Sequence, residues 1–291
     1  MRTSNMDDYH FYNNELSLHC RTQGHESNPT AMIFLHGLAS NATRWQELMS
    51  NLALEDKSYL LAMDLRGHGH SMTYKRYQRS DWCKDIDKLI KILDRPTILI
   101  GHSMGAQVAL DYATRHNTNL QGLILIDPVF PQALTGVLKR AAHLRWLIFM
   151  VATILRTLNR LGLRKHSYPY RSLYELDQKT RTFLASNPDK GIAELYMSPL
   201  VDLEFIPLAN YLQDLFEVTR KLPRLDNINV PVLVLLSSGA STSNIEINKE
   251  LLSKLPELEI ATIQADHWLL TEKPDEARRV IEDWSRQKLG I

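Results

Sequence analysis

The sequence is poor in cysteine, in net charge and in long hydrophobic runs. Its only two cysteines, Cys20 and Cys83, lie far apart among 291 residues. So few thiols fit a reducing compartment, where a single disulfide is possible but not needed. Lys and Arg together number 34 and Asp and Glu 33, which leaves a formal net charge of +1. That balance gives no electrostatic reason to expect a nucleic-acid partner.

The chain also has no obvious segment for export or for crossing a membrane. Its first eight residues are polar and partly acidic, without the apolar core of a signal peptide. No stretch reaches the apolar length of a membrane-spanning helix, and no repeat or low-complexity segment is visible. We therefore expect a cytoplasmic globular protein, built as one large domain or as a core with a smaller inserted domain.

Short apolar runs alternate with amphipathic segments along most of the chain. The expected strands are 31–35, 59–63, 97–100, 122–126, 231–236 and 258–263, after two short antiparallel strands within 9–21. The expected helices are 41–54, 80–94, 106–113 and 275–289, the second with Ser80 as its candidate N-cap. This alternation predicts an α/β fold with a mostly parallel central sheet flanked by helices.

The alternation stops between residues 129 and 221. This segment has no convincing strand and is helical in character, broken by Gly162 and several prolines. We interpret 129–221 as an inserted helical cap, or lid, so that 1–128 and 222–291 form the core domain.

The motif Gly-x-Ser-x-Gly at residues 101–105 lies between an expected strand and an expected helix. A nucleophile elbow needs this context, because the turn holds its serine in a strained backbone conformation. Larger side chains at Gly101 and Gly105 would collide with their surroundings. Ser103 is therefore the candidate nucleophile, and the backbone N–H of Met104 is a candidate oxyanion donor.

His36-Gly37-Leu38 follows directly after the strand 31–35. Ligands in open α/β sheets bind at the carboxyl edge of the strands, so the N–H of Leu38 is the candidate second oxyanion donor. The side chain of His36 is expected to brace this loop rather than to act in catalysis.

The loop 64–70 carries two histidines between glycines. We expect Asp64 and Arg66 to form a pair that shapes it. His68 and His70 are expected to be structural rather than metal ligands, because no third ligand has suitable spacing.

A serine hydroxyl needs a general base and an acid that orients the base. His267 is the candidate base, because it follows the last expected strand and should lie at the same sheet edge as Ser103. The side chain of His102 should point away from that of its neighbour Ser103. Asp266 is adjacent to His267 and is expected to point elsewhere.

Together these segments resemble α/β-hydrolase-fold enzymes of the esterase and lipase type with a helical cap. The resemblance is carried by His36-Gly37, Asp64-Leu65-Arg66-Gly67-His68-Gly69, Gly101-His102-Ser103-Met104-Gly105 and Asp266-His267, and it spans nearly the whole chain outside the cap. It implies the fold, a Ser–His–acid triad and no cofactor.

The sequence departs from the family pattern at the acid. Members commonly carry it in the loop after the strand that resumes beyond the cap, but the loop 236–244 holds no carboxylate. Asp127 ends the strand after the elbow, an alternative position used by some members of this fold, and is the favoured acid. Glu246 is a second candidate, and the absence of any effective acid is a third. Asp127 could also be a turn residue before Pro128.

The expected activity is hydrolysis of carboxylic esters through an acyl-enzyme, with a small lipophilic ester as substrate. A thioesterase, a lactonase or a C–C bond hydrolase could use the same fold, and haloperoxidation without a cofactor is also open. A catalytically weakened protein that binds a small molecule or a partner is the alternative from another class, suggested by the bare loop 236–244.

The segment between Asp127 and Glu175 contains eight basic residues and no acidic one, around the uncharged run 146–155. As a helix, this run should bury most of its surface, partly on the core directly above Ser103 and partly as an acyl pocket. The flanking cations suggest weak contact with an anionic membrane. Packing within a dimer or against neighbouring helices is the alternative. The residues expected to contact the substrate are His36, Gly37, His102, Trp146, Phe149 and Trp268.

Overall fold

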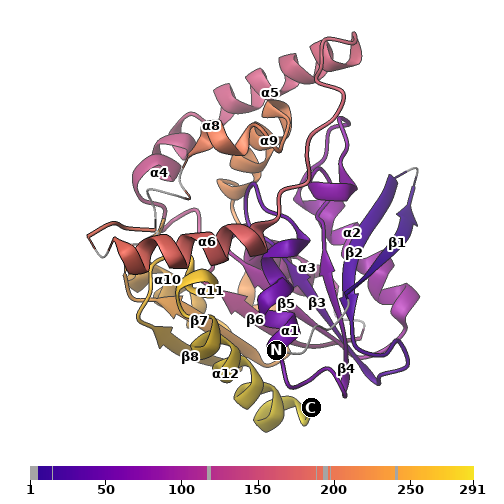
Figure 1. Cartoon of the computed structure of the whole chain (residues 1–291), viewed down its shortest axis with the longest axis vertical. Coiled ribbons are helices and arrows are strands. Elements are labelled where there is room, and N and C mark those ends of the chain that lie inside the picture. The colour runs from indigo at the N-terminus through magenta and orange to yellow at the C-terminus, as the bar shows by residue number, and fades with distance from the viewer. Residues whose placement is uncertain are drawn as a thin grey trace.

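The computed structural model describes residues 6–14, 16–116, 119–187, 189–192, 196, 198–239 and 242–291. An eight-stranded sheet lies at its centre, in the order β1-β2-β4-β3-β5-β6-β7-β8 (Figure 1). The strands are β1 Asp7–Asn13, β2 Leu16–Gln23, β3 Thr30–Leu35, β4 Ser58–Met63, β5 Thr97–His102, β6 Leu120–Ile126, β7 Val232–Ser237 and β8 Leu258–Ile263. Only β2 runs against its neighbours, and the strands from β4 across to β8 are parallel. The predicted α/β class is confirmed.

Helices connect the strands of this core. They are η1 Ala42–Trp45, α1 Gln46–Asn51, η2 Gly69–Ser71, α2 Arg79–Leu93, α3 Met104–Arg115, η3 Leu225–Asn227, α10 Ile245–Leu252, α11 Leu269–Glu272, α12 Pro274–Trp284 and the π-helical η4 Ser285–Leu289. α2 begins one residue earlier than expected. Its N-cap is Gln78, which forms a capping box with Asp81, and not Ser80.

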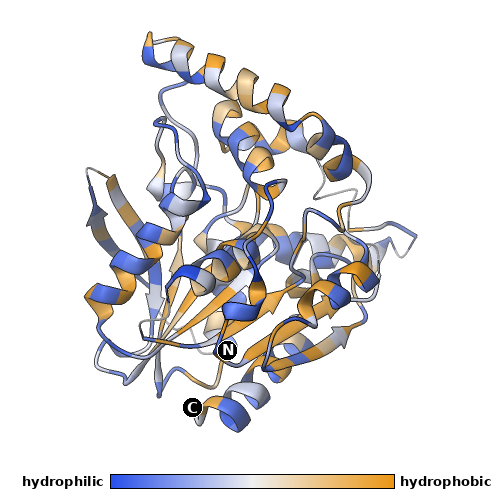
Figure 2. Ribbon diagram, turned by 180° about the vertical axis from the view of Figure 1, so that it is seen from behind, coloured by the Kyte–Doolittle hydropathy of each residue, from blue (hydrophilic) through white to orange (hydrophobic). Residues whose placement is uncertain are grey.

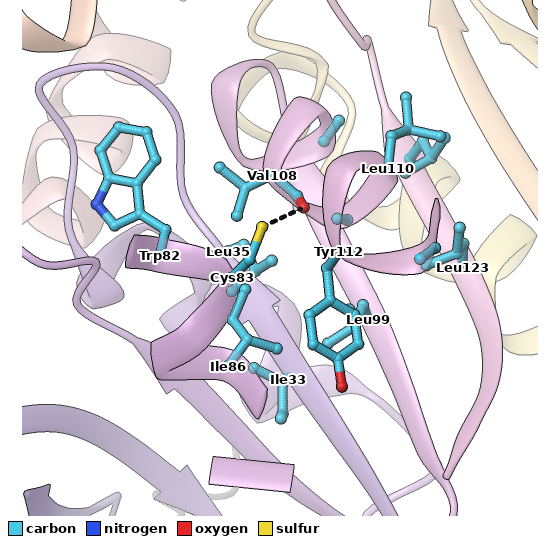
Figure 3. Packing of buried hydrophobic residues seen from close by; sticks show 14 of the residues in the cluster. Ile33, Leu35, Trp82, Cys83, Ile86, Leu99, Val108, Leu110, Tyr112 and Leu123 are labelled. Carbon is cyan, nitrogen blue, oxygen red and sulfur yellow. Dashed lines mark hydrogen bonds between the residues drawn. The ribbon is translucent and has the colours of Figure 1, made fainter. Parts of the chain in front are cut away.

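Two apolar layers cover the two faces of the sheet. Side chains alternate along a strand, so β3 sends Ile33 and Leu35 into one layer and Met32 and Phe34 into the other. The first layer includes α2 and α3, and Figure 3 shows their side chains packed against β3 and β5. The second includes α1 and α12. The central strands appear apolar along their length in Figure 2, as expected for strands buried on both faces.

The helices described within residues 129–221 lie on the side of the sheet where its parallel strands end, and the one at 173–186 stands apart from the others, next to α11 (Figure 1). They are α4 Gly136–His143, α5 Arg145–Arg160, α6 Leu173–Ser186, α8 Pro199–Asp202 and α9 Leu208–Val218, called the inserted helices below. No described residue of 129–221 belongs to a strand, and the one extended contact is the isolated bridge between Leu134 and Ser243. The domain boundaries at 128 and 222 stay a prediction.

The loop 64–71 differs from expectation. Asp64 does not pair with Arg66: its carboxylate binds His19 and accepts hydrogen bonds from the backbone of Ala42 and His70. Arg66 reaches Asp85 on α2 instead. The pairing was missed because both partners come from elements distant in sequence.

Both histidines of this loop make structural contacts. His68 Nε2 lies 3.0 Å from Asp214 Oδ2 on α9, and the ring of His70 stacks on Tyr170 at 4.0 Å. His68 thereby ties the core to the inserted helices. Cys20 and Cys83 are both buried and free, so the possible disulfide is not formed.

Candidate active site

Ser103 stands at the turn between β5 and α3. Its backbone has φ 54° and ψ −114°, a conformation that residues other than glycine rarely adopt. A Cβ on Gly101 would lie 2.5 Å from the backbone of Gly105, and one on Gly105 would lie 2.1 Å from the carbonyl oxygen of Leu35. The two glycines therefore allow α3 to pack directly on the sheet, which confirms the collision expected from the sequence.

His267 lies in the loop after β8 and approaches the serine. Its Nε2 is 3.0 Å from Ser103 Oγ. Its backbone carbonyl lies 3.1 Å from His102 Nε2, and its ring packs edge-on against Trp268 at 5.5 Å. These two contacts help to hold His267, whose side chain is only 7% exposed.

Asp127 directly follows β6, with φ 42°, and points at the far side of the same imidazole. Its Oδ2 is 2.5 Å from His267 Nδ1. Its Oδ1 accepts hydrogen bonds from the backbone N–H of Ser237 at 3.0 Å and from the hydroxyl of Ser237 at 2.9 Å. Ser103, His267 and Asp127 therefore form one continuous chain of polar contacts.

Asp127 remains a carboxylate in this buried position. Burial alone would raise its pKa, but the hydrogen bond and charge of His267 and the two donors of Ser237 outweigh that effect and lower the pKa. The negative charge favours the Nδ1–H tautomer of His267, which leaves Nε2 free to accept a proton from Ser103.

Glu246 lies away from this chain of contacts. It is in the first turn of α10, its side chain is 80% exposed, and it pairs with Lys249 at 3.0 Å. Within the loop 236–244, Ala240 and Ser241 lie outside the described residues.

The two candidate oxyanion donors flank the elbow. Met104 is the first residue of α3, where backbone N–H groups have no partner within the helix. Leu38 follows Gly37, and a Cβ on Gly37 would lie 3.4 Å from that of Ser103. The loop after β3 therefore contacts the elbow, as its place at the carboxyl edge of the sheet requires.

His36 and His102 were expected to contact the substrate, but both side chains are buried in the protein. Both ring nitrogens of His36 contact protein atoms, and Nε2 of His102 contacts the carbonyl of His267. His36 is fully buried, with Nδ1 2.8 Å from the carbonyl of Gly37 and Nε2 accepting from the backbone of Leu65. Burial is the first cause that lowers the pKa of each to about 3. Both imidazoles are therefore neutral supports, and His36 leaves no ring nitrogen for a ligand.

The position expected for the apolar run 146–155 is wrong. It forms α5, which packs on α9 and is the outermost of the inserted helices (Figure 1), rather than on the core above Ser103. Trp146 and Phe149 contact Phe216 of α9 at ring distances of 5.7 and 4.9 Å, and Trp146 is 65% exposed. α9 covers one side of α5, so the apolar side chains on its other side remain exposed.

Trp268 is the expected substrate contact that lies beside the catalytic candidates. Its ring packs on His267 and, at 5.5 Å, on Tyr196. Tyr196 in turn lies against Arg44, which pairs with Asp177. No sequence pattern signals this network, since Arg44 and Asp177 are 133 residues apart.

Ser237 is the site residue that the sequence reasoning missed. Its place at the end of β7, next to the strand that ends in Asp127, was a usable signal. Parallel neighbours end at the same edge, so a hydroxyl there can reach the adjacent strand's carboxylate.

The chain is similar to several hydrolases. It is 26% identical over 262 residues to a putative esterase/lipase of Haemophilus influenzae, covering 88% of this chain and 83% of that protein. It is 35% identical over 114 residues to a 2-(acetamidomethylene)succinate hydrolase of Mesorhizobium japonicum, a match that spans only 38% of this chain and 39% of that relative.

Solved structures agree on the fold. The crystal structure of an E-2-(acetamidomethylene)succinate hydrolase matches with a TM-score of 0.69 at 20% identity, covering 99% of this chain and 100% of the other. An enol-lactonase from Burkholderia xenovorans LB400 matches with a TM-score of 0.67 at 17% identity, covering 94% and 98%. The sequence profile of the family described as serine aminopeptidase, S33, matches residues 27–273. The chain therefore belongs to this family of α/β-hydrolase-fold hydrolases.

Proposed function

We propose that the protein is a serine hydrolase that cleaves carboxylic esters with an apolar acyl group. The observation that carries the proposal is the chain of contacts from Ser103 through His267 to Asp127, at 3.0 and 2.5 Å. These three groups have the separations that nucleophile, base and orienting acid require.

In the proposed reaction, Ser103 Oγ attacks the ester carbonyl carbon and its proton moves to His267 Nε2. Asp127 stabilises the resulting imidazolium, and the backbone N–H groups of Leu38 and Met104 stabilise the oxyanion. The C–O bond breaks, and the alcohol leaves with the proton from His267. A water then attacks the acyl-enzyme, with His267 again as base, and releases the acid.

Trp268 supports an apolar acyl group, because its indole lies beside His267 and is partly exposed. The helix α5 does not support it directly, since it packs away from Ser103. We expect kcat/KM on p-nitrophenyl esters to rise from acetate towards medium chain length. Each buried methylene should contribute up to about 0.8 kcal/mol to binding of the transition state. A maximum at acetate would exclude an acyl pocket.

A fluorophosphonate probe tests the nucleophile, since it reacts only with an activated serine. We expect rapid labelling of the wild-type protein and none of Ser103→Ala, with ester hydrolysis reduced by several powers of ten. Ser186→Ala, at an exposed position in α6, is the matched control and should behave as wild type. Retention of more than about a tenth of the rate by Ser103→Ala would refute the assignment.

If the probe does not label the wild-type protein, the alternative of a catalytically weakened, ligand-binding homologue is favoured. The sequence suggested that alternative because the loop 236–244 lacks an acid. Asp127 now lies against His267, which removes the main argument for it. The relatives act on different bonds, so parallel assays with a thioester, a lactone and an amide define the bond that is cleaved.

A further inference from the structure

The inserted helix α5 has two apolar faces, and only one of them is covered. The inner face carries the buried residues Ala152 and Arg156, whose guanidinium donates to the backbone carbonyls of Tyr74, Lys75 and Ala209. The outer face carries large apolar side chains that are 36–74% exposed. These are Leu147, Met150, Val151, Ile154, Leu158 and Leu161.

These six side chains form one stripe, called the outer stripe here. At 3.6 residues per turn they fall within about 100° of one another on the helix, opposite Ala152 and Arg156. Leu144, Trp146 and Leu163 extend it at the two ends, with 54, 65 and 68% of their surfaces exposed. Figures 1 and 2 show α5 at the outer limit of the molecule, with apolar residues recurring along it. A continuous row of exposed apolar side chains is the kind of surface at which proteins bind partners or membranes.

Basic residues flank the outer stripe along the chain, before and after it. Of the eight basic residues between Asp127 and Glu175, Arg156 is buried and Arg171 pairs with Asp202. The other six lie on or next to α4 and α5. They are Lys139, Arg140, Arg145, Arg160, Arg164 and Lys165. Within the part of the chain that the structure describes, none of the six pairs with a carboxylate, so their charge is available to a partner.

The charge pattern decides between two occupants of this surface. In a symmetric pair of α5 helices, the cations at one end of each helix would approach cations of the partner, because residues 128–174 include no acidic residue. Like charges brought together in this way oppose association. Anionic lipid headgroups meet the same cations favourably, while the outer stripe enters the boundary between headgroups and acyl chains.

The length of α5 is consistent with lying on a bilayer and not with crossing it. Its 16 residues span about 24 Å, which is shorter than the hydrocarbon core of about 30 Å. No single helix among the described residues meets the length and apolarity needed to span a membrane. α4 and α5 meet them only as a pair bent by 77°.

We propose that the protein binds anionic membrane surfaces through the outer stripe of α5 and the basic residues that flank it along the chain. The inference does not depend on the proposed ester hydrolysis, because Ser103 and His267 take no part in it. The Ser103→Ala protein should therefore bind membranes as the wild-type protein does, which separates the failure of one proposal from the failure of the other.

Flotation of the full-length protein with vesicles tests the proposal. We expect binding to phosphatidylcholine vesicles that contain about 30% phosphatidylglycerol, and at least tenfold weaker binding to phosphatidylcholine alone. Raising the salt from about 50 to about 500 mM should weaken binding to the anionic vesicles by about tenfold or more.

Two double variants test the two components of the surface. Met150→Gln with Ile154→Gln removes apolar area and should weaken binding at least about tenfold. Arg140→Gln with Arg160→Gln removes two charges and should weaken it about tenfold or more. Ile92→Gln on α2, where the side chain is 43% exposed, is the matched apolar control. Lys57→Gln with Lys88→Gln is the matched charge control, and both controls should bind as wild type.

Each contrary result overturns the proposal. Wild-type protein that does not float with anionic vesicles at low salt has no such surface. Equal binding by the α5 variants and their controls places the contact elsewhere, and equal binding to neutral vesicles removes the role of the cations. A wild-type dimer that Met150→Gln with Ile154→Gln converts to a monomer, without vesicle binding, would identify a second copy as the occupant. Circular dichroism of each variant verifies its folding.

Discussion

Replacing Asp127 by asparagine should reverse the tautomer of His267, and the structure shows why. The two donors of Ser237 point at Oδ1 of Asp127, so the amide oxygen of an asparagine would take that place. The amide nitrogen would then face His267 Nδ1 and donate to it. His267 would carry its proton on Nε2, the atom that must accept the proton of Ser103.

The expected cost in kcat is about 10³- to 10⁴-fold, or about 4–5.5 kcal/mol, since both the tautomer and the support of the imidazolium are lost. Turnover of a soluble p-nitrophenyl ester and the rate of fluorophosphonate labelling measure it, with circular dichroism to verify folding. Glu246→Gln, at an exposed carboxylate that contacts Lys249, is the matched control and should retain full activity.

Ser237→Ala provides a graded test of the same reasoning. It removes one of the two donors to Oδ1 and leaves the backbone N–H, so we expect a loss of about tenfold or less. Asp127→Asn that keeps more than a tenth of wild-type kcat would refute the role of Asp127. If Glu246→Gln were the damaging change instead, the acid would lie on α10.

Two further predictions concern stability. Gly105→Ala should destabilise the fold by about 3 kcal/mol or more, because its Cβ would lie 2.1 Å from the carbonyl oxygen of Leu35; chemical denaturation measures it, with Gly191→Ala, which meets nothing within 4 Å, as the control that should change little. Stability should also be greatest near pH 6.5. Burial lowers the pKa of His36 and His102 to about 3. Each of them therefore lowers the free energy of unfolding by about 1.4 kcal/mol for every pH unit below 6.5. Burial would lower the pKa of His19 and His68, but Asp64 and Asp214, respectively, outweigh it and raise each pKa. The stability that these two histidines contribute is therefore lost as the pH rises above 6.5 through the raised pKa values. Denaturation midpoints that change monotonically from pH 5 to pH 8 would contradict this balance.

Local sequence determines much of the core, which is why its elements could be predicted. Strands such as 258–263 coincide with β8, and the others differ by one or two residues at their ends. Buried parallel strands give continuous apolar runs, and the elbow motif is read directly from five adjacent residues. The alternation of strands and helices then left few possible topologies.

The contacts that the sequence did not reveal join residues far apart in the chain. Asp64 reaches His19 instead of its near neighbour Arg66, and Arg44 reaches Asp177. A carboxylate binds whichever donor the fold brings to it, and periodicity carries no information about that partner. The same limit explains the error on α5, since an apolar run predicts that a helix needs partners but not which of its faces finds one.

The surroundings of Asp127 illustrate how one such distant contact bears on a local anomaly. The loop after β7 lacks the carboxylate expected of this type of enzyme. Ser237 at the end of β7 instead donates two hydrogen bonds to Asp127, which follows the adjacent strand. Burial would raise the pKa of Asp127, but the contact with His267 at 2.5 Å and then those two donors lower it. A second carboxylate at the end of β7 would face Asp127 across neighbouring strands and would raise its pKa by charge repulsion. If Asp127 is the acid, as proposed, a neutral donor at the end of β7 helps His267 to keep Asp127 ionised, and the bare loop is then no sign of a missing acid.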